Sequence, residues 1–171
     1  MIKNNCVVGI VAALLLWSQA VFSIPNSQVD LDISAESIAR IALYYEDRPL
    51  NGKEFDFPLP INGISQKFEN TSSFFHLIGN VDNAEIVFLE NQFVLPQVFG
   101  GNTHINLDGS FIHQGGETDS TKKLRLPVLK NISQATTSNG FKVKFISEFL
   151  AGNYTKGKYA NTFTLIVMPI L

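Results

Sequence analysis

The sequence predicts an all-β fold, a sandwich of two antiparallel sheets. Three observations lead to this prediction. About eight to ten β-rich runs are separated by frequent turn signals, which is typical of sandwiches and barrels. No segment of helix length carries helical periodicity. The 14 phenylalanines supply large apolar side chains for a substantial core. An eight-stranded barrel is the alternative arrangement of the same strands.

Residues 1–23 are predicted to be a secretory signal peptide. Lys3 gives a positive first region, residues 7–17 form an apolar core, and small residues then stand at cleavage spacing. Cleavage fits after Ala20 or after Ser23, and Ser23 is favoured. The apolar run is shorter than the roughly 18 to 20 residues that a membrane span requires, so an uncleaved anchor is the weaker interpretation.

Composition excludes several classes of function. The single cysteine, Cys6, lies in the predicted signal peptide, so the exported chain would have no disulfide, no thiol chemistry and no cysteine metal site. The formal charge of −2 includes Lys3, and no run of Lys or Arg is present. A slightly acidic chain without a basic patch is not expected to bind nucleic acid.

The stretch 27–35 directly follows the signal peptide and alternates without a break. One face carries apolar Val29, Leu31, Ile33 and Ala35, and the other carries Gln28, Asp30, Asp32 and Ser34. This period of two predicts a strand with one face buried. A strand at the start of a mature chain can join its own sheet or be given to another molecule.

The other predicted strands follow in order. They are residues 38–45, 54–59, 71–79, 84–90, 93–95, 103–107, 110–113, 124–132 (broken around Pro127), 141–149 and 158–168. Turn signals separate them, beginning with residues 46–52, which contain a proline and an Asn-Gly pair. Only residues 34–42 compete as a helix, with a serine cap, but they run directly into Tyr44 and Tyr45.

Two hairpins are predicted. Residues 71–79 and 84–90 are joined by a short Asn/Asp connection, and Asp108-Gly109 is a two-residue hairpin signal. The polar, glycine-containing residues 114–123 are expected to form a long exposed loop. The last strand, residues 158–168, is apolar on both faces, which predicts a central or sandwiched strand.

The histidines are the starting point for any enzyme or metal site. His104 and His113 would lie on the two arms of the predicted Asp108-Gly109 hairpin and could face each other, while His76 lies in an apolar strand. Without an acidic or cysteine ligand nearby, such a pair makes a weak metal site. Hydrogen-bonded strand histidines are the simpler expectation, and we expect no metal.

Other chemistry has no clear basis in the sequence. No serine stands in a Gly-x-Ser-x-Gly elbow, Gly115-Gly116-Glu117 lacks the lysine of a phosphate loop, and Asp30 and Asp32 fit a solvated strand face. The sequons at Asn70, Asn131 and Asn153 are expected by chance in a chain rich in Asn, Ser and Thr. We therefore expect no enzyme and no cofactor.

The phenylalanines mostly fall in strand-like runs, where large apolar side chains are expected inside. A cavity lined by these rings would instead make the protein a secreted β-sandwich or β-barrel that binds a hydrophobic ligand. That ligand-binding module is the main competing hypothesis. A hydrolase on a β scaffold is a remote third.

Four features, in this order, resemble an exported fimbrial pilin of the chaperone–usher pathway, of the class 5 colonisation-factor type. They span most of the mature chain. They are the alternating residues 29–35, the apolar residues 38–43 with their turn, the block from residues 65–70 through 80–83 to 86–89, and the ending 156–159 followed by the two-faced strand 162–168.

The resemblance implies an immunoglobulin-like sandwich that lacks its final strand. The resulting apolar groove is filled by a neighbour's N-terminal extension, which is a form of β-strand addition. Residues 24–36 would be the donor extension and residues 37–171 the pilin domain, with Val29, Leu31, Ile33 and Ala35 as donor side chains. Family members often have a proline just after the donor strand, and this chain has none there.

The resemblance also implies a structural role and a set of partners. Partners would be neighbouring subunits in a homopolymer, a periplasmic chaperone and an outer-membrane usher, with a tip adhesin and a host-surface receptor as further candidates. The chain would pass through the periplasm to a fimbrium at the cell surface and would support adhesion to host cells. A single domain favours a shaft subunit over a tip adhesin.

Overall fold

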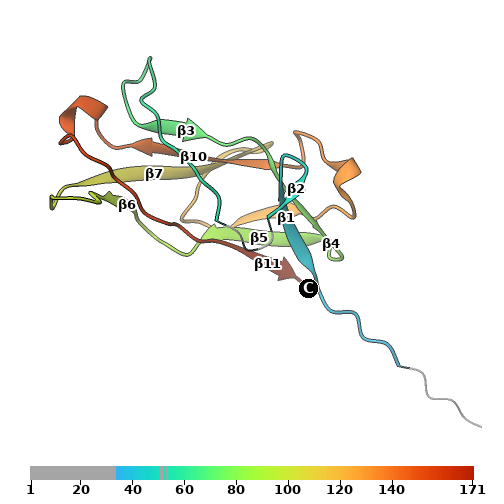
Figure 1. Ribbon diagram of the computed structural model, residues 1–171. Coiled ribbons are helices and arrows are strands. Elements are labelled where there is room, and N and C mark those ends of the chain that lie inside the picture. Colours follow the sequence, from blue (N-terminus) through green and yellow to red (C-terminus); the bar gives the residue numbers. More distant parts are fainter. Residues whose placement is uncertain (1–33, 51, 53) are drawn as a thin grey trace, which may run out of the picture. The chain divides into compact units, whose positions relative to one another are not determined.

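The computed structural model describes residues 34–50, 52 and 54–171 (Figure 1). Residues 37–171 form one compact unit. The strands of the described residues lie in this unit, and their bounds are β1 Ile41–Tyr45, β2 Arg48–Pro49, β3 Glu69–Thr71, β4 Phe75–Gly79, β5 Asn83–Phe88, β6 Phe93–Pro96, β7 His104–His113, β8 Gly116–Asp119, β9 Leu124–Pro127, β10 Phe141–Ser147 and β11 Leu165–Ile170. Two short 3₁₀ helices, η1 Ile132–Gln134 and η2 Ala151–Asn153, lie in the connections.

The strands form two antiparallel sheets. The larger has the order β2-β1-β4-β10-β7-β6, with β3 added to β10 and β8 to β7, and the smaller has the order β11-β5-β9. The all-β prediction is confirmed, and two separate sheets correspond to the sandwich rather than the barrel. Residues 34–40 form no helix, and β1 begins at Ile41.

Stacked rings hold the two sheets together. Phe88 of β5 lies parallel to Phe111 of β7, with centroids 5.6 Å apart, and Phe111 also meets Phe141 of β10 edge to face at 5.8 Å. Phe111 and Phe141 are fully buried. Because β5 belongs to one sheet and β7 and β10 to the other, these rings form the centre of the core.

Replacing Phe111 by alanine is expected to cost about 3 to 5 kcal/mol of unfolding free energy, since the site is fully enclosed and cannot collapse around the loss. Urea unfolding followed by near-UV circular dichroism measures this. Phe99→Ala, at a ring that is 75 % exposed, is the matched control and should change the free energy of unfolding by less than about 0.5 kcal/mol. Equal effects of the two substitutions would contradict this account of the core.

The strand order is that of an immunoglobulin-like sandwich. In that fold strands A-B-E-D form one sheet and C-F-G the other. Here β1-β4-β10-β7 take the places of A-B-E-D, and β5 and β11 those of C and F, in the same chain order. Tyr159, between β10 and β11, donates from its hydroxyl to the carbonyl of Thr155 at 2.8 Å, as the tyrosine corner before strand F does.

Of two predicted turns, the structure contains one and contradicts the other. The predicted turn after β1 is present, and the chain reverses at Glu46 and Asp47, whose φ angles of 46° and 64° match the right-handed twist of a tight hairpin. The predicted hairpin of residues 71–79 with 84–90 is wrong. Strand β4 pairs in the larger sheet and β5 in the smaller, so their short connection crosses between the sheets.

The predicted hairpin at Asp108-Gly109 is also wrong. Strand β7 runs without interruption from His104 to His113 and pairs with β10 across Gly109. The glycine is needed for packing: a Cβ there would lie 2.4 Å from Ser120 Oγ and 2.7 Å from a ring carbon of Phe145. The chain instead reverses after His113, and strand β8 occupies part of the predicted loop 114–123.

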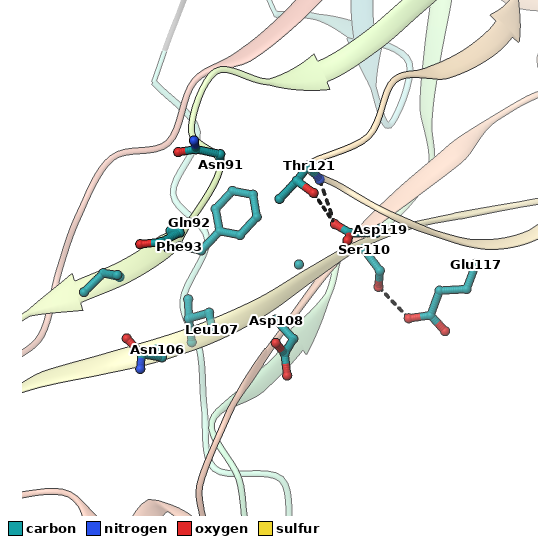
Figure 2. Close-up of a pocket in the computed structure, with 12 residues that line it drawn as sticks. Asn91, Gln92, Phe93, Asn106, Leu107, Asp108, Ser110, Glu117, Asp119 and Thr121 are labelled. Carbon is teal, nitrogen blue, oxygen red and sulfur yellow. Dashed lines mark hydrogen bonds between the residues drawn. The ribbon is translucent and has the colours of Figure 1, made fainter.

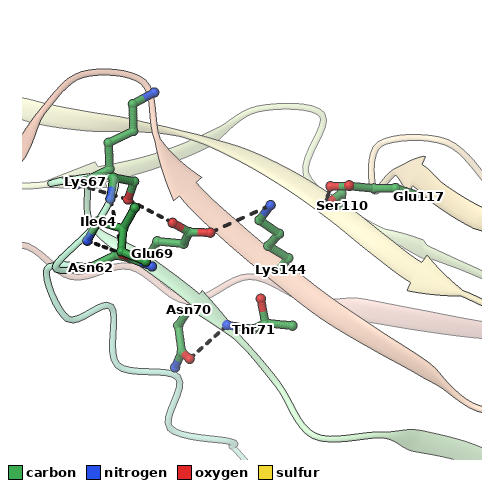
Figure 3. Close-up of polar contacts among 10 residues, drawn as sticks. Asn62, Ile64, Lys67, Glu69, Asn70, Thr71, Ser110, Glu117 and Lys144 are labelled. Carbon is green, nitrogen blue, oxygen red and sulfur yellow. Dashed lines mark hydrogen bonds and ion pairs between the residues drawn. The ribbon is translucent and has the colours of Figure 1, made fainter. Parts of the chain in front are cut away.

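Short polar contacts attach β3 to the edge of β10. The ammonium of Lys144 lies 3.7 Å from the carboxylate of Glu69, which also accepts a hydrogen bond from Ser65 Oγ at 3.0 Å (Figure 3). Asn62 closes the preceding turn by accepting the N–H of Ile64 at 2.8 Å. This turn leads the irregular residues 54–60 into the larger sheet.

Candidate functional site

Among the described residues, strand β11 is paired along one edge only, and we call its other edge open. It pairs with β5 from Leu165 opposite Phe88 to Ile170 opposite Asn83. No strand among the described residues pairs with its other edge, which is the edge that strand G takes in an immunoglobulin sandwich. Alternate N–H and C=O groups along such an edge are free to pair with another strand. The prediction that the last strand is central or sandwiched is therefore wrong.

The core-facing side chains of β11 are only partly covered. Residues directly opposite each other in an antiparallel pair point to the same face. Leu165 lies opposite Phe88 and Val167 opposite Ile86, and both partners are buried. Leu165 and Val167 thus point toward the core, yet each remains half-buried. The apolar interior is exposed along this strand.

Strand β1 repeats the pattern in the larger sheet. Leu43 lies opposite Leu77 and Tyr45 opposite Phe75, both of which are buried, while Ile41 lies opposite Gly79. All residues of β1 are half-buried. Strands β1 and β11 contact each other but do not pair. We call their core-facing residues the open seam: Ile41, Leu43, Tyr45, Leu165 and Val167.

The register fixes the direction of the two strands that form the open seam. Ile41 lies beside Gly79 at the end of β4, and Ile170 lies beside Asn83 at the start of β5. The connection between Gly79 and Asn83 is short, so Ile41 and Ile170 lie at the same end of the seam. Strands β1 and β11 therefore run in opposite directions, and a strand antiparallel to β11 would run parallel to β1.

Asn80 holds the chain where it enters β1. Its side-chain oxygen accepts the N–H of Arg40 at 2.6 Å, its side-chain amide donates to the carbonyl of Ile38 at 2.8 Å, and its N–H donates to the carbonyl of Arg40 at 3.1 Å. These bonds continue the ladder of β1 and β4 beyond Ile41. Residues 38–40 are thereby held extended, in line with β1.

Most of the predicted donor residues lie outside the residues that the structure describes. Val29, Leu31 and Ile33, like the predicted signal peptide, lie outside the described residues. Ala35 is described, is exposed and belongs to no strand. The residues of the open seam, which would accept a strand, were not predicted from the sequence. The apolar residues on both faces of the last strand were the signal that could have indicated them.

A polar hollow lies on β6, β7 and β8 (Figure 2). It has a volume of about 590 Å³, and its lining includes Asn91, Asn106, Asp108, Glu117 and Asp119. Its polar groups partly satisfy one another: Ser110 Oγ donates to Glu117 at 2.5 Å, and both the N–H and the hydroxyl of Thr121 donate to Asp119. These contacts order the β7–β8 hairpin and the turn after it.

The pKa of the Asp119 carboxyl is lowered, first by the hydrogen bond from the Thr121 N–H and then by that from the Thr121 hydroxyl. Desolvation opposes this shift, and the charge of Lys122 adds to it least. A depressed pKa stabilises the fold at pH values above the unfolded pKa of about 3.9, and this stabilisation is lost as the pH falls through the folded pKa.

Thr121→Val removes the hydroxyl and should raise the pKa of Asp119, measured by NMR titration. An unchanged pKa would assign the shift to the backbone and Lys122 alone.

His76 and His113 make structural hydrogen bonds, and His104 is exposed. His104 and His113 stand at opposite ends of β7, about 30 Å apart at 3.4 Å per residue, and so cannot face each other. His113 accepts the N–H of Gly115 at Nδ1 and contacts Thr118 Oγ1 through Nε2 at 3.0 Å, and His76 Nε2 lies 2.9 Å from the carbonyl of Thr136. In residues 34–50, 52 and 54–171, no three His, Cys, Asp or Glu side chains are grouped to hold a metal.

Comparison with known proteins finds likeness to solved structures. No protein-family model and no curated protein matches the sequence. A solved chain from a study of the chaperone–tip adhesin complex in CFA/I fimbriae biogenesis is similar, with 15% identity and a TM-score of 0.49. The match covers 77% of this chain and 42% of the solved chain, so this chain spans less than half of that chain's length. No helix within the described part of the chain has the length and apolar character to cross a membrane.

Proposed function

We propose that this protein is a structural subunit of a surface fimbria, polymerised when the N-terminal strand of one copy enters the open seam of the next. The observation that carries the proposal is the open seam itself. Its core-facing residues are half-buried on both sides of an unpaired edge, so the fold offers a place for one further strand. The resemblance to class 5 pilins supplies the occupant, residues 27–35 of a neighbour.

The predicted donor fits the chemistry of the seam. Val29, Leu31, Ile33 and Ala35 would face the core, and Asp30 and Asp32 would face water. Burial of each large apolar side chain contributes about 1.5 to 3 kcal/mol, and the main-chain ladder adds to this. Filling the edge also removes an exposed strand that would otherwise promote aggregation. Such an assembly needs no disulfide.

The geometry favours a neighbour's strand over the chain's own. If the chain's own residues 27–35 filled the seam antiparallel to β11, they would end near Tyr45. The chain would then have to return along the seam, past Ile41, to reach Ile38. Only two residues separate Ala35 from Ile38, and they span at most about 11 Å. The seam is about 17 Å long for the five steps from Leu165 to Ile170. While Asn80 holds residues 38–40, the chain's own extension cannot fill the seam in this direction.

A structural role explains the core better than a ligand-binding one. The phenylalanines that could have lined a lipid cavity pack on one another, with Phe93 and Phe145 5.0 Å apart and Phe88 and Phe145 5.6 Å apart. We therefore propose no catalytic role and no cofactor. The proposed partners are further copies of the chain, a periplasmic chaperone, an outer-membrane usher, a tip adhesin and a host-surface receptor.

The test is to produce the chain without its predicted signal peptide and without a chaperone. Electron microscopy and size-exclusion chromatography should show polymers of the intact chain and none after deletion of residues 27–35. A synthetic peptide of residues 27–35 should raise the melting temperature of the deleted chain. A carrier of a hydrophobic ligand would be monomeric in both forms, and that result would overturn the proposal.

A further inference from the structure

An irregular segment crosses the sandwich beside the open seam. Residues 54–60, which we call the strap, lead from the β1–β2 hairpin toward β3 (Figure 1). Phe55, Phe57 and Leu59 alternate with Glu54, Asp56, Pro58 and Pro60, and Phe57 and Leu59 pack against the core while the charged residues are exposed. The strap thus presents an apolar face like that of a strand, although it belongs to no sheet.

The strap covers one end of the seam with its rings. Phe55 meets Tyr45 of the seam at 4.5 Å between centroids and Phe75 at 5.8 Å. Phe57 meets Phe145 at 5.8 Å, and Phe145 in turn meets Phe163, two residues before β11, at 5.6 Å. The strap therefore reaches from β1 toward the start of β11, at the end of the seam opposite Ile41 and Ile170.

In the part of the chain that the structure describes, the hydrogen bonds to the strap's backbone lie at its far end. The carbonyl of Pro58 accepts from the Asn70 side chain at 2.7 Å, and the carbonyl of Pro60 accepts from the N–H of Glu69 at 3.0 Å. Within the described residues no N–H of the strap donates a hydrogen bond, and its two prolines have none to donate. Phe55 is 38% exposed. A segment with so few backbone bonds opens at low cost.

We propose that the strap is a placeholder: it covers the Tyr45 end of the seam until a strand arrives, and it is displaced when that strand pairs along the full length of β11. The proposal rests on the proposed function. An incoming strand would cover the same core residues, Tyr45 and Phe145, that the rings of the strap cover. The strap thereby covers the Tyr45 end of the seam in an empty subunit and sets the rate at which the seam accepts a strand.

The test uses the full chain without its predicted signal peptide, carrying Leu31→Asp so that it cannot donate. A fluorescent synthetic peptide of residues 27–35 is the probe, and its association rate is measured by stopped-flow anisotropy. Phe57→Ser should raise the rate about tenfold, the effect of losing one or two aromatic contacts. Phe55→Ser, at a partly exposed ring, should act in the same direction with a smaller risk to folding. Ile64→Ser, at a side chain that is 97% exposed, is the matched control.

A second measurement follows the strap directly. Chymotrypsin should cleave after Phe55 faster in the peptide-bound chain than in the free chain, because the bound strand releases the strap, whereas the Phe57–Pro58 bond resists the enzyme in both states. If the peptide binds but neither the association rate nor the cleavage changes, the strap is a fixed part of the core and this inference is wrong. If no variant binds the peptide, the proposed function fails and the strap's role fails with it.

Discussion

Leu31→Asp in the full chain is expected to abolish polymers while leaving the domain folded. The substitution places a carboxylate where the donor strand would insert a large apolar side chain into a neighbour's core. An unpaired charge in that position costs far more than the lost burial of about 1.5 to 3 kcal/mol. Ile33→Asp should act in the same way. Electron microscopy and sedimentation measure the polymers, and circular dichroism measures the fold.

The matched control for the donor lies one residue along the chain. Asp32→Asn changes the charge on the face that is expected to point to water, and polymers should form normally. Normal filaments with Leu31→Asp or Ile33→Asp would mean that residues 27–35 are not the donated strand. Loss of filaments with Asp32→Asn as well would show that residues 27–35 do not insert as a strand with one face toward the core and one toward water.

Val167→Asp is the corresponding change on the acceptor side and should also abolish polymers. Val167 points toward the core opposite buried Ile86 but is itself half-buried. A carboxylate there can reach water in the free subunit and would be buried under an added strand, so the cost falls mainly on strand uptake. Ile166→Asp, on the other face of the same strand opposite Val87, is the control and should still polymerise.

Mixing the two defective chains sharpens the test. The Leu31→Asp chain retains the proposed seam unchanged, and the Val167→Asp chain retains the proposed donor strand unchanged. Together they can form only one junction, so the mixture should contain a dimer and nothing larger, measured by light scattering. Longer polymers would show that at least one of the two substitutions misses the junction. An absence of dimers, with both chains folded, would place the donor or the acceptor elsewhere.

Local pattern was a good guide to strands and a poor guide to their partners. The alternation in residues 84–90 and 141–149 marks β5 and β10, whose side chains alternate between buried and half-buried. The same local signals failed at Asp108-Gly109, where the glycine relieves crowding from Ser120 and Phe145 instead of making a turn. They failed again between β4 and β5, because a short polar connection serves a hairpin and a crossing between sheets equally well.

In the candidate site, too, local pattern predicted a strand but not the strands that would lie beside it. The sequence pointed to a strand for donation, since an alternating stretch after a predicted signal peptide is a local pattern. It could not identify the acceptor, because half-burial of Leu43, Tyr45, Leu165 and Val167 depends on which strands lie beside them. Apolar residues on both faces of the last strand are compatible with a central strand and equally with an edge strand that another strand can cover.

By itself the sequence determined the all-β class, most strand positions and the aromatic core, because side-chain period and turn chemistry act over a few residues. The strand predicted at residues 54–59 is wrong, since these residues are irregular, and the last strand begins at Leu165 and not at residue 158. Only the tertiary structure decided which strands pair, which turns are crossings, and that no described strand pairs with the edge of β11 next to β1. Those outcomes depend on contacts between residues far apart in the chain. They are set by how two sheets share one core, which no local pattern encodes.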